Sequence, residues 1–283
     1  MGLDLTKIQS RLKDLSSKNT DQRNKLIWKP VPGKQTIRII PYSKSPENPF
    51  IELKFHYNMN NKTYISPDTF NRPDPIVEFS NKLKSSGDKE EWKIGKKLEP
   101  KLRTFAPVIV RGQEAEGVRF WGFGKQVYES ILSVIADPDY GDITDLASGR
   151  DIVVEFKTAE EVGKSFPETT IRVKPNQTPA VDPTNKEMIE KIRNQSDILD
   201  LFPELSYDEL KNVMDAWLHP EESEVDTSAS NVAGKEEVET PEPTAAAAAA
   251  ARVTSPSKTK STENTEDITK AFDNLFGNKT EKK

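Results

Sequence analysis

Cations alternate with aromatic rings along one short stretch of this 283-residue chain. Side chains two positions apart share a face of a β-strand, so Arg119, Trp121 and Phe123 point the same way, with Lys125 just beyond them. Unpaired bases stack on exposed rings of this kind, and phosphates require Lys or Arg along the track. The spacing therefore favours a site for single-stranded nucleic acid. The other interpretation places Trp121 and Phe123 in the core and leaves the arginine in solvent.

A second stretch repeats the arrangement, because Lys101, Arg103 and Phe105 also occupy alternate positions. Lys34 and Lys96 add further cations in the same half of the chain. We expect phosphates to lie along the cations and bases to stack on the rings. The predicted nucleic-acid contacts are Lys25, Arg38, Tyr64, Lys101, Arg103, Phe105, Arg119, Trp121, Phe123 and Lys125.

The formal net charge of −5 is divided unevenly along the chain. Residues 1–125 hold 24 Lys and Arg against 14 Asp and Glu, whereas residues 126–220 hold 9 against 19 and residues 221–283 hold 8 against 13. A basic first half beside an acidic remainder predicts a polyanion site in the former and a competing or partner-binding element in the latter. Alternatively, the charges are solvated faces that cancel after folding.

Residues for catalysis and metal binding are scarce. The absence of cysteine excludes disulfides, thiolate zinc sites and cysteine nucleophiles. Two histidines, His56 and His219, cannot form a three-histidine metal site. We therefore expect a binding protein that is not an enzyme and that needs no metal or other cofactor.

One acidic run, at residues 137–145, resembles a calcium-binding loop at first sight. It breaks the ligand order of such loops, since Gly141 and Asp142 occupy the fifth and sixth positions. We interpret the run as an exposed loop that ends a helix. A metal-dependent nuclease built on its carboxylates, from Asp137 to Asp145, is a disfavoured alternative.

Short β-type segments dominate residues 25–174, and Pro, Gly and Asn separate them. Helical periodicity interrupts them at 76–84 and 125–136, and it returns at 185–192 and 207–218. This order predicts a mainly β fold with helices, of the α+β class, arranged as a partly open, five- to six-stranded OB-like barrel. The predicted strands are residues 35–40, 50–57, 102–110, 118–123, 152–156 and 169–173.

The first 20 residues form a predicted amphipathic arm, in which apolar side chains recur at spacings of three and four. A helix of about four turns is marginal in water, so its apolar stripe requires another surface. That surface belongs either to its own domain or to a neighbouring copy. The predicted self-association residues are Leu5, Ile8, Arg11, Leu12 and Leu15.

Beyond a predicted binding core at residues 21–218, residues 219–283 form an acidic tail rich in Glu, Ser, Thr, Pro and Ala. This composition buries too little apolar surface to offset chain entropy, so we expect disorder. One apolar island with spacing i, i+4, i+7 and i+8 is typical of a short partner-binding helix, and the alternative is a frayed terminus. The island consists of Ile268, Phe272, Leu275 and Phe276.

Several of these segments, taken in order, resemble a known family. Residues 36–41 (TIRIIP), His56, residues 62–65 (KTYI) and residues 123–125 (FGK) resemble the replication single-stranded DNA-binding protein of T-even-type tailed phages. The similarity extends over residues 1–218. It implies an oligonucleotide-binding barrel without catalysis and an N-terminal segment that contacts the next protomer along the strand. It also implies a C-terminal tail that docks replication and recombination proteins.

The chain also departs from this family. Trp121 takes the place of a cleft tyrosine, Lys125 falls on a family lysine, and Gly122 falls on a family arginine. The T-even protein holds zinc with one histidine and three cysteines, whereas here His56 matches the histidine and no cysteine exists. Zinc is therefore not expected, and the prolines within residues 66–75 are expected to supply rigidity instead.

The leading hypothesis is a non-enzymatic protein that coats single-stranded DNA with little sequence preference during phage replication, recombination and repair. Its expected partners are single-stranded DNA, neighbouring copies, and phage replication and recombination proteins, in the cytoplasm of an infected bacterial host. No membrane partner is expected, because no apolar stretch reaches the roughly 18 residues of a membrane span. An RNA-binding translational regulator on the same fold is the alternative.

Overall fold

The computed structural model describes residues 25–219 and five residues near the C-terminus, at positions 268, 271, 272, 275 and 276. These residues form two compact units. Unit 1 contains the described residues up to Leu53 and Leu102–Phe202, and unit 2 contains Lys54–Lys101 and the described residues from Pro203 onward.

The predicted self-association residues of the N-terminal arm, and most of the predicted acidic tail, lie outside the described residues. Within the described ranges, no helix has the length and apolar character that a bilayer crossing requires. The arm residues concerned are Leu5, Ile8, Arg11, Leu12 and Leu15.

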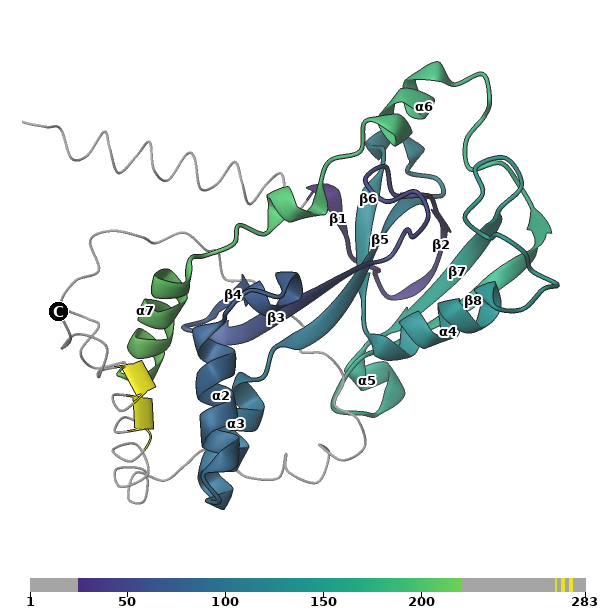
Figure 1. The fold of residues 1–283 in the computed structure, drawn as a ribbon. Coiled ribbons are helices and arrows are strands. Elements are labelled where there is room, and N and C mark those ends of the chain that lie inside the picture. Colours follow the sequence, from purple (N-terminus) through teal and green to yellow (C-terminus); the bar gives the residue numbers. More distant parts are fainter. Residues whose placement is uncertain (1–24, 220–267, 269–270, 273–274, 277–283) are drawn as a thin grey trace, which may run out of the picture. The chain divides into compact units, whose positions relative to one another are not determined.

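Unit 1 is built on six strands in hydrogen-bonded order, which Figure 1 labels. Only β1 pairs in parallel, with β6, and the other neighbours along this path are antiparallel. In spatial order the strands are β1 (Ile27–Trp28), β6 (Arg119–Phe123), β5 (Lys101–Val110), β2 (Gly33–Ile39), β7 (Arg150–Lys157) and β8 (Glu168–Gln177).

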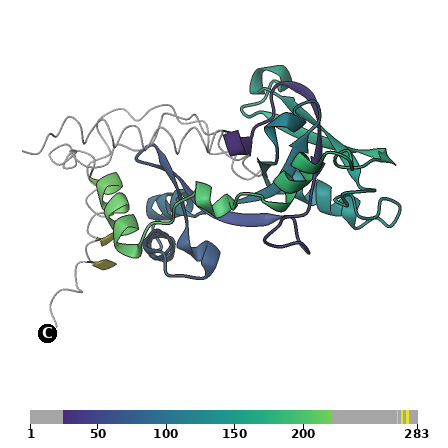
Figure 2. The same cartoon turned by 90° about the horizontal axis from the view of Figure 1, so that it is seen from above.

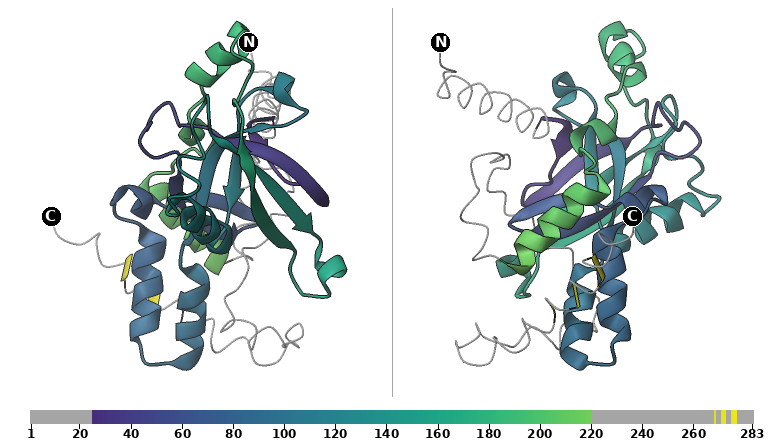
Figure 3. Two further views of the ribbon diagram at one scale, coloured as in Figure 1. Left: turned by 90° about the vertical axis from the view of Figure 1, so that its right-hand side faces the viewer. Right: turned by 60° about the vertical axis from the view of Figure 1, so that its left-hand side comes forward.

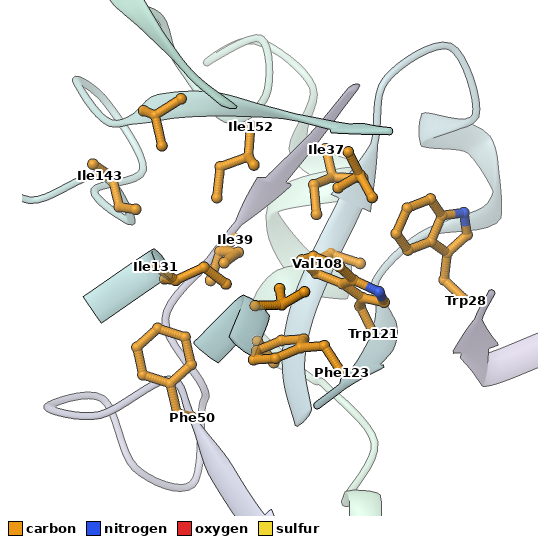
Figure 4. Close-up of a cluster of buried hydrophobic side chains, with 14 of the residues drawn as sticks. Trp28, Ile37, Ile39, Phe50, Val108, Trp121, Phe123, Ile131, Ile143 and Ile152 are labelled. Atoms are coloured by element: carbon orange, nitrogen blue, oxygen red, sulfur yellow. The ribbon is translucent and has the colours of Figure 1, made fainter. Parts of the chain in front are cut away.

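One face of this sheet carries the main core of unit 1. Helix α4 (Lys125–Ile135) lies against β8 in Figure 1 and contributes Val127 and Ile131, which lie one turn apart on the same side of the helix. They pack among strand side chains such as Ile37 and Ile152, as Figure 4 shows for Ile131. Burial of this apolar surface, at roughly 25 cal/mol per Å², is the main force that holds α4 on the sheet.

The opposite face of the sheet is covered over part of its area. Helix α6 (Lys186–Arg193) contributes Met188 and Ile192, which pack with Ile40 and Ile109. The side chain of Asn185 starts this helix by accepting a hydrogen bond from the Met188 N–H at 3.0 Å.

Unit 2 begins with a β-hairpin. Strand β3 (Ile51–Met59) starts in unit 1, continues into unit 2 and pairs with β4 (Lys62–Ile65). The turn between them places Asn60 and Asn61 at φ values of 53° and 59°. This left-handed pair is what a two-residue hairpin loop requires, and asparagine tolerates it.

Three helices complete unit 2, and each begins at a side chain that accepts hydrogen bonds from the first turn: Asp74, Asp88 or Ser206. Their buried faces share one apolar cluster. Figure 3 shows α2 and α3 as neighbours, and Figure 2 shows α7 beside α2. The helices are α2 (Pro75–Ser85), α3 (Lys89–Leu98) and α7 (Tyr207–Leu218).

The mixture of helices and strands confirms the predicted α+β class, whereas the OB-like barrel stays a prediction. The sequence pattern does not indicate α3, because charged residues dominate it and Gly95 interrupts it. Gly95 has a packing reason, since a Cβ there would lie 2.8 Å from the Ser80 carbonyl oxygen. The remaining short elements are η1 (Pro67–Phe70), η2 (Glu114–Glu116), α5 (Ala159–Val162) and η3 (Ile198–Leu201).

Candidate nucleic-acid interface

Trp121 and Phe123 belong to the core of unit 1, so their predicted role as exposed stacking rings is wrong. Trp121 is 1% exposed, and its ring centroid lies 4.6 Å from that of Phe123 and 5.7 Å from that of Trp28. Figure 4 shows these rings among aliphatic side chains such as Val108. Rings enclosed in this way have no free face for a base.

Both faces of β6 are covered, which is why the alternation misled the prediction. A period of two identifies the side chains that share a face, but it does not identify the face that meets solvent. On the side opposite Trp121, Phe120 packs edge-on to Tyr42 at 5.9 Å. Phe105 in β5 is also buried, 5.6 Å from the ring of Phe202, so its predicted contact with nucleic acid is wrong for the same reason.

Arg38 is a structural residue, which corrects its predicted role as a phosphate contact. Its side chain is 0% exposed, and Nη2 lies 2.9 Å from Asp151 Oδ1. Nη1 donates to the Thr178 carbonyl at 2.8 Å, and Nη2 donates to the Thr178 hydroxyl at 2.6 Å. Arg111 reaches the same carboxylate oxygen at 2.8 Å. The guanidinium of Arg38 therefore joins β2 to β7 and to the segment after β8.

Arg119 is also buried, and its guanidinium forms hydrogen bonds with side chains of unit 1. Nη1 donates to Glu116 at 2.6 Å and Nη2 donates to Gln113 at 2.6 Å, while Nε has no hydrogen-bond partner among the described residues. These three side chains and Trp28 form part of the wall of a hollow of about 450 Å³. Because a carboxylate already neutralises Arg119, the predicted phosphate contact is wrong.

Three of the predicted cations do meet solvent: Lys25 before β1, Lys101 at the start of β5, and Lys125. Arg103 is half-buried and donates from Nη2 to the Gly122 carbonyl at 2.9 Å. Lys101 belongs to unit 2 and Arg103 to unit 1, so the second alternating stretch is divided between the two units. The contacts of all four cations with nucleic acid stay predictions.

Tyr64, the remaining predicted contact, is half-buried in β4 and packs against the apolar cluster of unit 2. Burial raises the pKa of its hydroxyl, so the ring stays neutral across the physiological range. Its contact with a base stays a prediction.

Lys125 combines exposure with a favourable backbone position. It is the first residue of α4, and its side chain is 77% exposed. The preceding Gly124 supplies no side-chain cap, and no acidic residue occupies the first turn. Backbone N–H groups at a helix start attract anions, and the ammonium of Lys125 adds a full charge beside them. Its pair with Glu129, at 3.5 Å between Nζ and Oε1, is exposed and therefore weak.

Unit 1 carries a further cationic surface, which we call the β2–β7–β8 face and define by Lys34, Lys157 and Arg172. The strand register places Lys34 opposite Glu155 and Arg172 opposite Val153, on the side of the sheet away from α4. Lys34 Nζ and Lys157 Nζ lie 3.9 and 3.6 Å from the two oxygens of Glu155. One carboxylate thus serves two lysines, and Arg172 is exposed beside them.

On the strands of this face three cations meet two carboxylates, Glu155 and Glu168, and the hairpin turn adds Lys164 together with the exposed Glu160 and Glu161. Glu168 lies opposite Lys157 in the ladder, but it pairs with Lys164 near the turn. The sequence contains the pattern that predicts this face, because Lys157 and Arg172 stand next to the apolar Phe156 and Val173, which are buried, and neighbouring strand residues point to opposite faces.

In unit 2, the exposed ring that could stack on a base is Trp92, which the sequence pattern did not single out. Trp92 lies on α3 and is 47% exposed, and it is the one exposed aromatic side chain within the described ranges. Lys89 precedes it by three residues and Lys96 follows it by four, so all three share one side of the helix. The ring therefore lies between two exposed lysines, of which Lys96 pairs with Glu99 at 2.7 Å between Nζ and Oε2.

His56, which the resemblance placed at a zinc ligand, is held by protein groups. Nδ1 lies 3.1 Å from the Leu98 carbonyl oxygen and Nε2 lies 2.9 Å from Asp74 Oδ2. Both partners, a carbonyl oxygen and a carboxylate oxygen, are hydrogen-bond acceptors. Ser66 donates to the same Asp74 oxygen at 2.5 Å. Within the described ranges, no group of three metal-ligating side chains occurs.

The acidic run at residues 137–145 forms local turns. Asp145 accepts hydrogen bonds from the N–H groups of Ala147 and Ser148, and Asp142 accepts from the Thr144 N–H and hydroxyl. Their oxygens are thus used to shape the loop between α4 and β7.

The C-terminal island packs on unit 2. Ile268, Phe272 and Phe276 are buried in the apolar cluster of α2 and α7, and Leu275 is partly buried against it. A protein that binds these side chains must first displace them from unit 2.

The family comparison covers both units. The chain matches the family model described as gp32 DNA binding protein like over residues 32–216. A search of the curated proteins gave no match. Because the matched range includes the β2–β7–β8 face, Lys125 and Trp92, all three candidate elements fall within the family's domain. The match extends over more than half of the sequence, and the chain therefore belongs to the gp32-like DNA-binding protein family.

Proposed function

We propose that this protein binds and coats single-stranded DNA with little sequence preference, without enzymatic activity, during phage DNA replication, recombination and repair. The observation that carries the proposal is the match to a DNA-binding family across residues 32–216. The resemblance of segments such as residues 36–41 and 62–65 to the T-even single-strand binding protein supports the preference for unpaired DNA.

The exposed chemistry of each unit supports binding of phosphates and unpaired bases. Unit 1 offers the cations of the β2–β7–β8 face and Lys125 at the start of α4. Unit 2 offers Trp92 between two lysines. Duplex DNA encloses its base faces, so a protruding indole gains stacking energy only from an unpaired strand, at about 1 to 3 kcal/mol per base.

Comparison of three ligands tests the strand preference. We expect the full chain to bind oligo(dT) more tightly than a duplex of equal length and more tightly than oligo(rU), at each of several salt concentrations. Equal or tighter binding of oligo(rU) would instead favour an RNA-binding regulator on this fold. Labelled single strands incubated with the protein and Mg²⁺ should stay intact, and cleavage would refute the non-enzymatic assignment.

The assembly of copies along the strand is also proposed from the resemblance. We infer that the arm of residues 1–20 contacts the neighbouring copy and that replication and recombination proteins bind the acidic tail. An oligonucleotide long enough for two copies should then bind more tightly per copy than a short one, and deletion of residues 1–20 should abolish that gain. An equal gain with and without the arm would contradict this role.

A further inference from the structure

The C-terminal island makes specific contacts with unit 2. The ring of Phe272, which is 4% exposed, lies edge-on to Phe79 of α2 with centroids 5.6 Å apart and an interplanar angle of 87°. Phe276 lies 4.9 Å from Phe272 and belongs to the same apolar cluster as Met214 of α7. Ile268 is buried in this cluster as well. The segment thus contributes a row of apolar side chains at helical spacing to a surface made by two helices.

Two lysines, one from each helix, fix the backbone of this segment. Lys82 of α2 donates from Nζ to the Ala271 carbonyl at 2.7 Å. Lys211 of α7 donates to the Phe276 carbonyl at 3.4 Å, and its ammonium lies 5.2 Å from the centroid of the Phe276 ring. Hydrogen bonds in which the donor is charged are stronger than those between neutral groups. We call the surface that receives the segment the α2–α7 face and define it by Phe79, Lys82, Lys211 and Met214.

The length of chain before the segment allows it to reach another molecule. Forty-nine residues, 219–267, separate the end of α7 at Leu218 from Ile268. At no more than about 3.3 to 3.6 Å per residue, such a connection spans at most roughly 160 to 175 Å. This reach far exceeds the size of a single unit, so covalent connection does not restrict the segment to its own α2–α7 face.

We propose that the α2–α7 face is an exchangeable docking site, which takes the segment 268–276 of a second copy when copies lie side by side on one DNA strand. Tethering gives an intramolecular ligand an effective concentration of order millimolar, so an isolated chain at micromolar concentration fills its own site. Copies held side by side on one DNA strand present their segments to each other at a similar local concentration. Exchange of an identical element between copies then costs little, because every contact is reproduced.

The occurrence of exchange on DNA rests on the proposed function, but the docking site itself does not. A labelled synthetic peptide of residues 263–283 represents the segment of a second copy, and its binding to the full chain can be measured by fluorescence anisotropy without nucleic acid. The wild-type chain should bind it weakly, because its own segment fills the site. The chain with Phe272→Ala and Phe276→Ala empties the site and should bind the peptide at least tenfold more tightly.

Two controls make the result specific. A peptide carrying Phe272→Ala should not bind the emptied chain. Adding Lys82→Ala and Lys211→Ala to the emptied chain should lower its affinity for the wild-type peptide severalfold, because both hydrogen bonds to the peptide backbone are removed. If Phe272→Ala and Phe276→Ala together unfold the chain, Phe276→Ala alone weakens the chain's own segment without changing the α2–α7 face, and it should still increase peptide binding.

The proposal is overturned if a folded, emptied chain, verified by circular dichroism, binds the peptide no better than wild type. It is also overturned if the Phe272→Ala peptide binds as tightly as the wild-type peptide. Failure of DNA binding in a separate oligo(dT) titration would refute the proposed function and leave the peptide result unaffected.

Discussion

Arg38 and Asp151 form a buried ion pair in unit 1, with 2.9 Å between Nη2 and Oδ1. Asp151 receives Arg111 on the same oxygen, so removal of Arg38 leaves one cation beside the carboxylate and leaves the Thr178 acceptors unpaired. Because Arg111 still compensates the charge of Asp151, the main loss is the unpaired Thr178 acceptors, at about 1 to 3 kcal/mol. We therefore expect Arg38→Ala to lower the free energy of unfolding by about this amount, measured by urea denaturation.

An exposed cation provides the control for Arg38. Lys125→Ala should leave the free energy of unfolding nearly unchanged while weakening oligo(dT) binding and reducing its salt dependence. The slope of log affinity against log salt should become shallower by about 0.7 for each phosphate that the variant no longer neutralises. If Arg38→Ala were as stable as wild type and bound DNA poorly, the structural assignment of Arg38 would be wrong.

Trp121 and Trp92 should respond in opposite ways to truncation. Trp121 is enclosed by Trp28 and Phe123, so Trp121→Ala should cost about 3 to 5 kcal/mol of stability. Trp92 is exposed, so Trp92→Ala should change the free energy of unfolding by no more than about 0.5 kcal/mol. Thermal denaturation of both variants measures the difference, and equal stability of the two would contradict the burial of Trp121.

Acid should lower the free energy of unfolding of unit 2, because it protonates the Asp74 carboxylate. Burial disfavours the charged carboxylate, but hydrogen bonds from His56 and Ser66 favour it more strongly, and the pKa of Asp74 lies below its ordinary value of 3.8. The stabilisation is therefore fully present above about pH 5 and is lost as the pH falls through the lowered pKa. Unfolding monitored by urea at several pH values should show this loss, and Asp74→Asn should reduce it. If the free energy of unfolding decreased equally with falling pH in wild type and in Asp74→Asn, this role of Asp74 would be contradicted.

A strong chelator should leave the fold unaltered. Both ring nitrogens of His56 lie at hydrogen-bond distance from Leu98 and Asp74, so a metal ion would have to displace one of these partners. The melting temperature with and without EDTA should agree. A large decrease with EDTA would show that a metal ion contributes to stability.

Regular elements could be predicted from the sequence where periodicity and caps agree. Ser206 and Glu209 form the capping box that starts α7, and Val127 and Ile131 mark the buried side of α4. Helix α3 is different, because its Gly95 is explained only by the close approach of Ser80, which is distant in sequence.

The candidate site was harder to predict than the elements. Alternation grouped Arg119 with Trp121 correctly, but only the packing of α4 shows that their face of β6 is enclosed. No sequence pattern marks Trp92 as an exposed ring, since the exposure of a single ring depends on how α3 packs on α2. The docking of Phe272 on Phe79 depends on an interaction across almost 200 residues, which local patterns do not contain.

Titration of intrinsic tryptophan fluorescence with oligo(dT) of increasing length tests the central claim most directly. Of the four tryptophans, Trp28 and Trp121 are buried, Trp217 is partly buried against the apolar cluster of unit 2, and Trp92 is exposed, so stacking of a base on Trp92 should dominate the change. We predict strong quenching in wild type, reversal by added salt, and loss of most of the quenching in Trp92→Phe. Oligo(dT) that neither quenches the fluorescence nor binds at low salt would contradict the account.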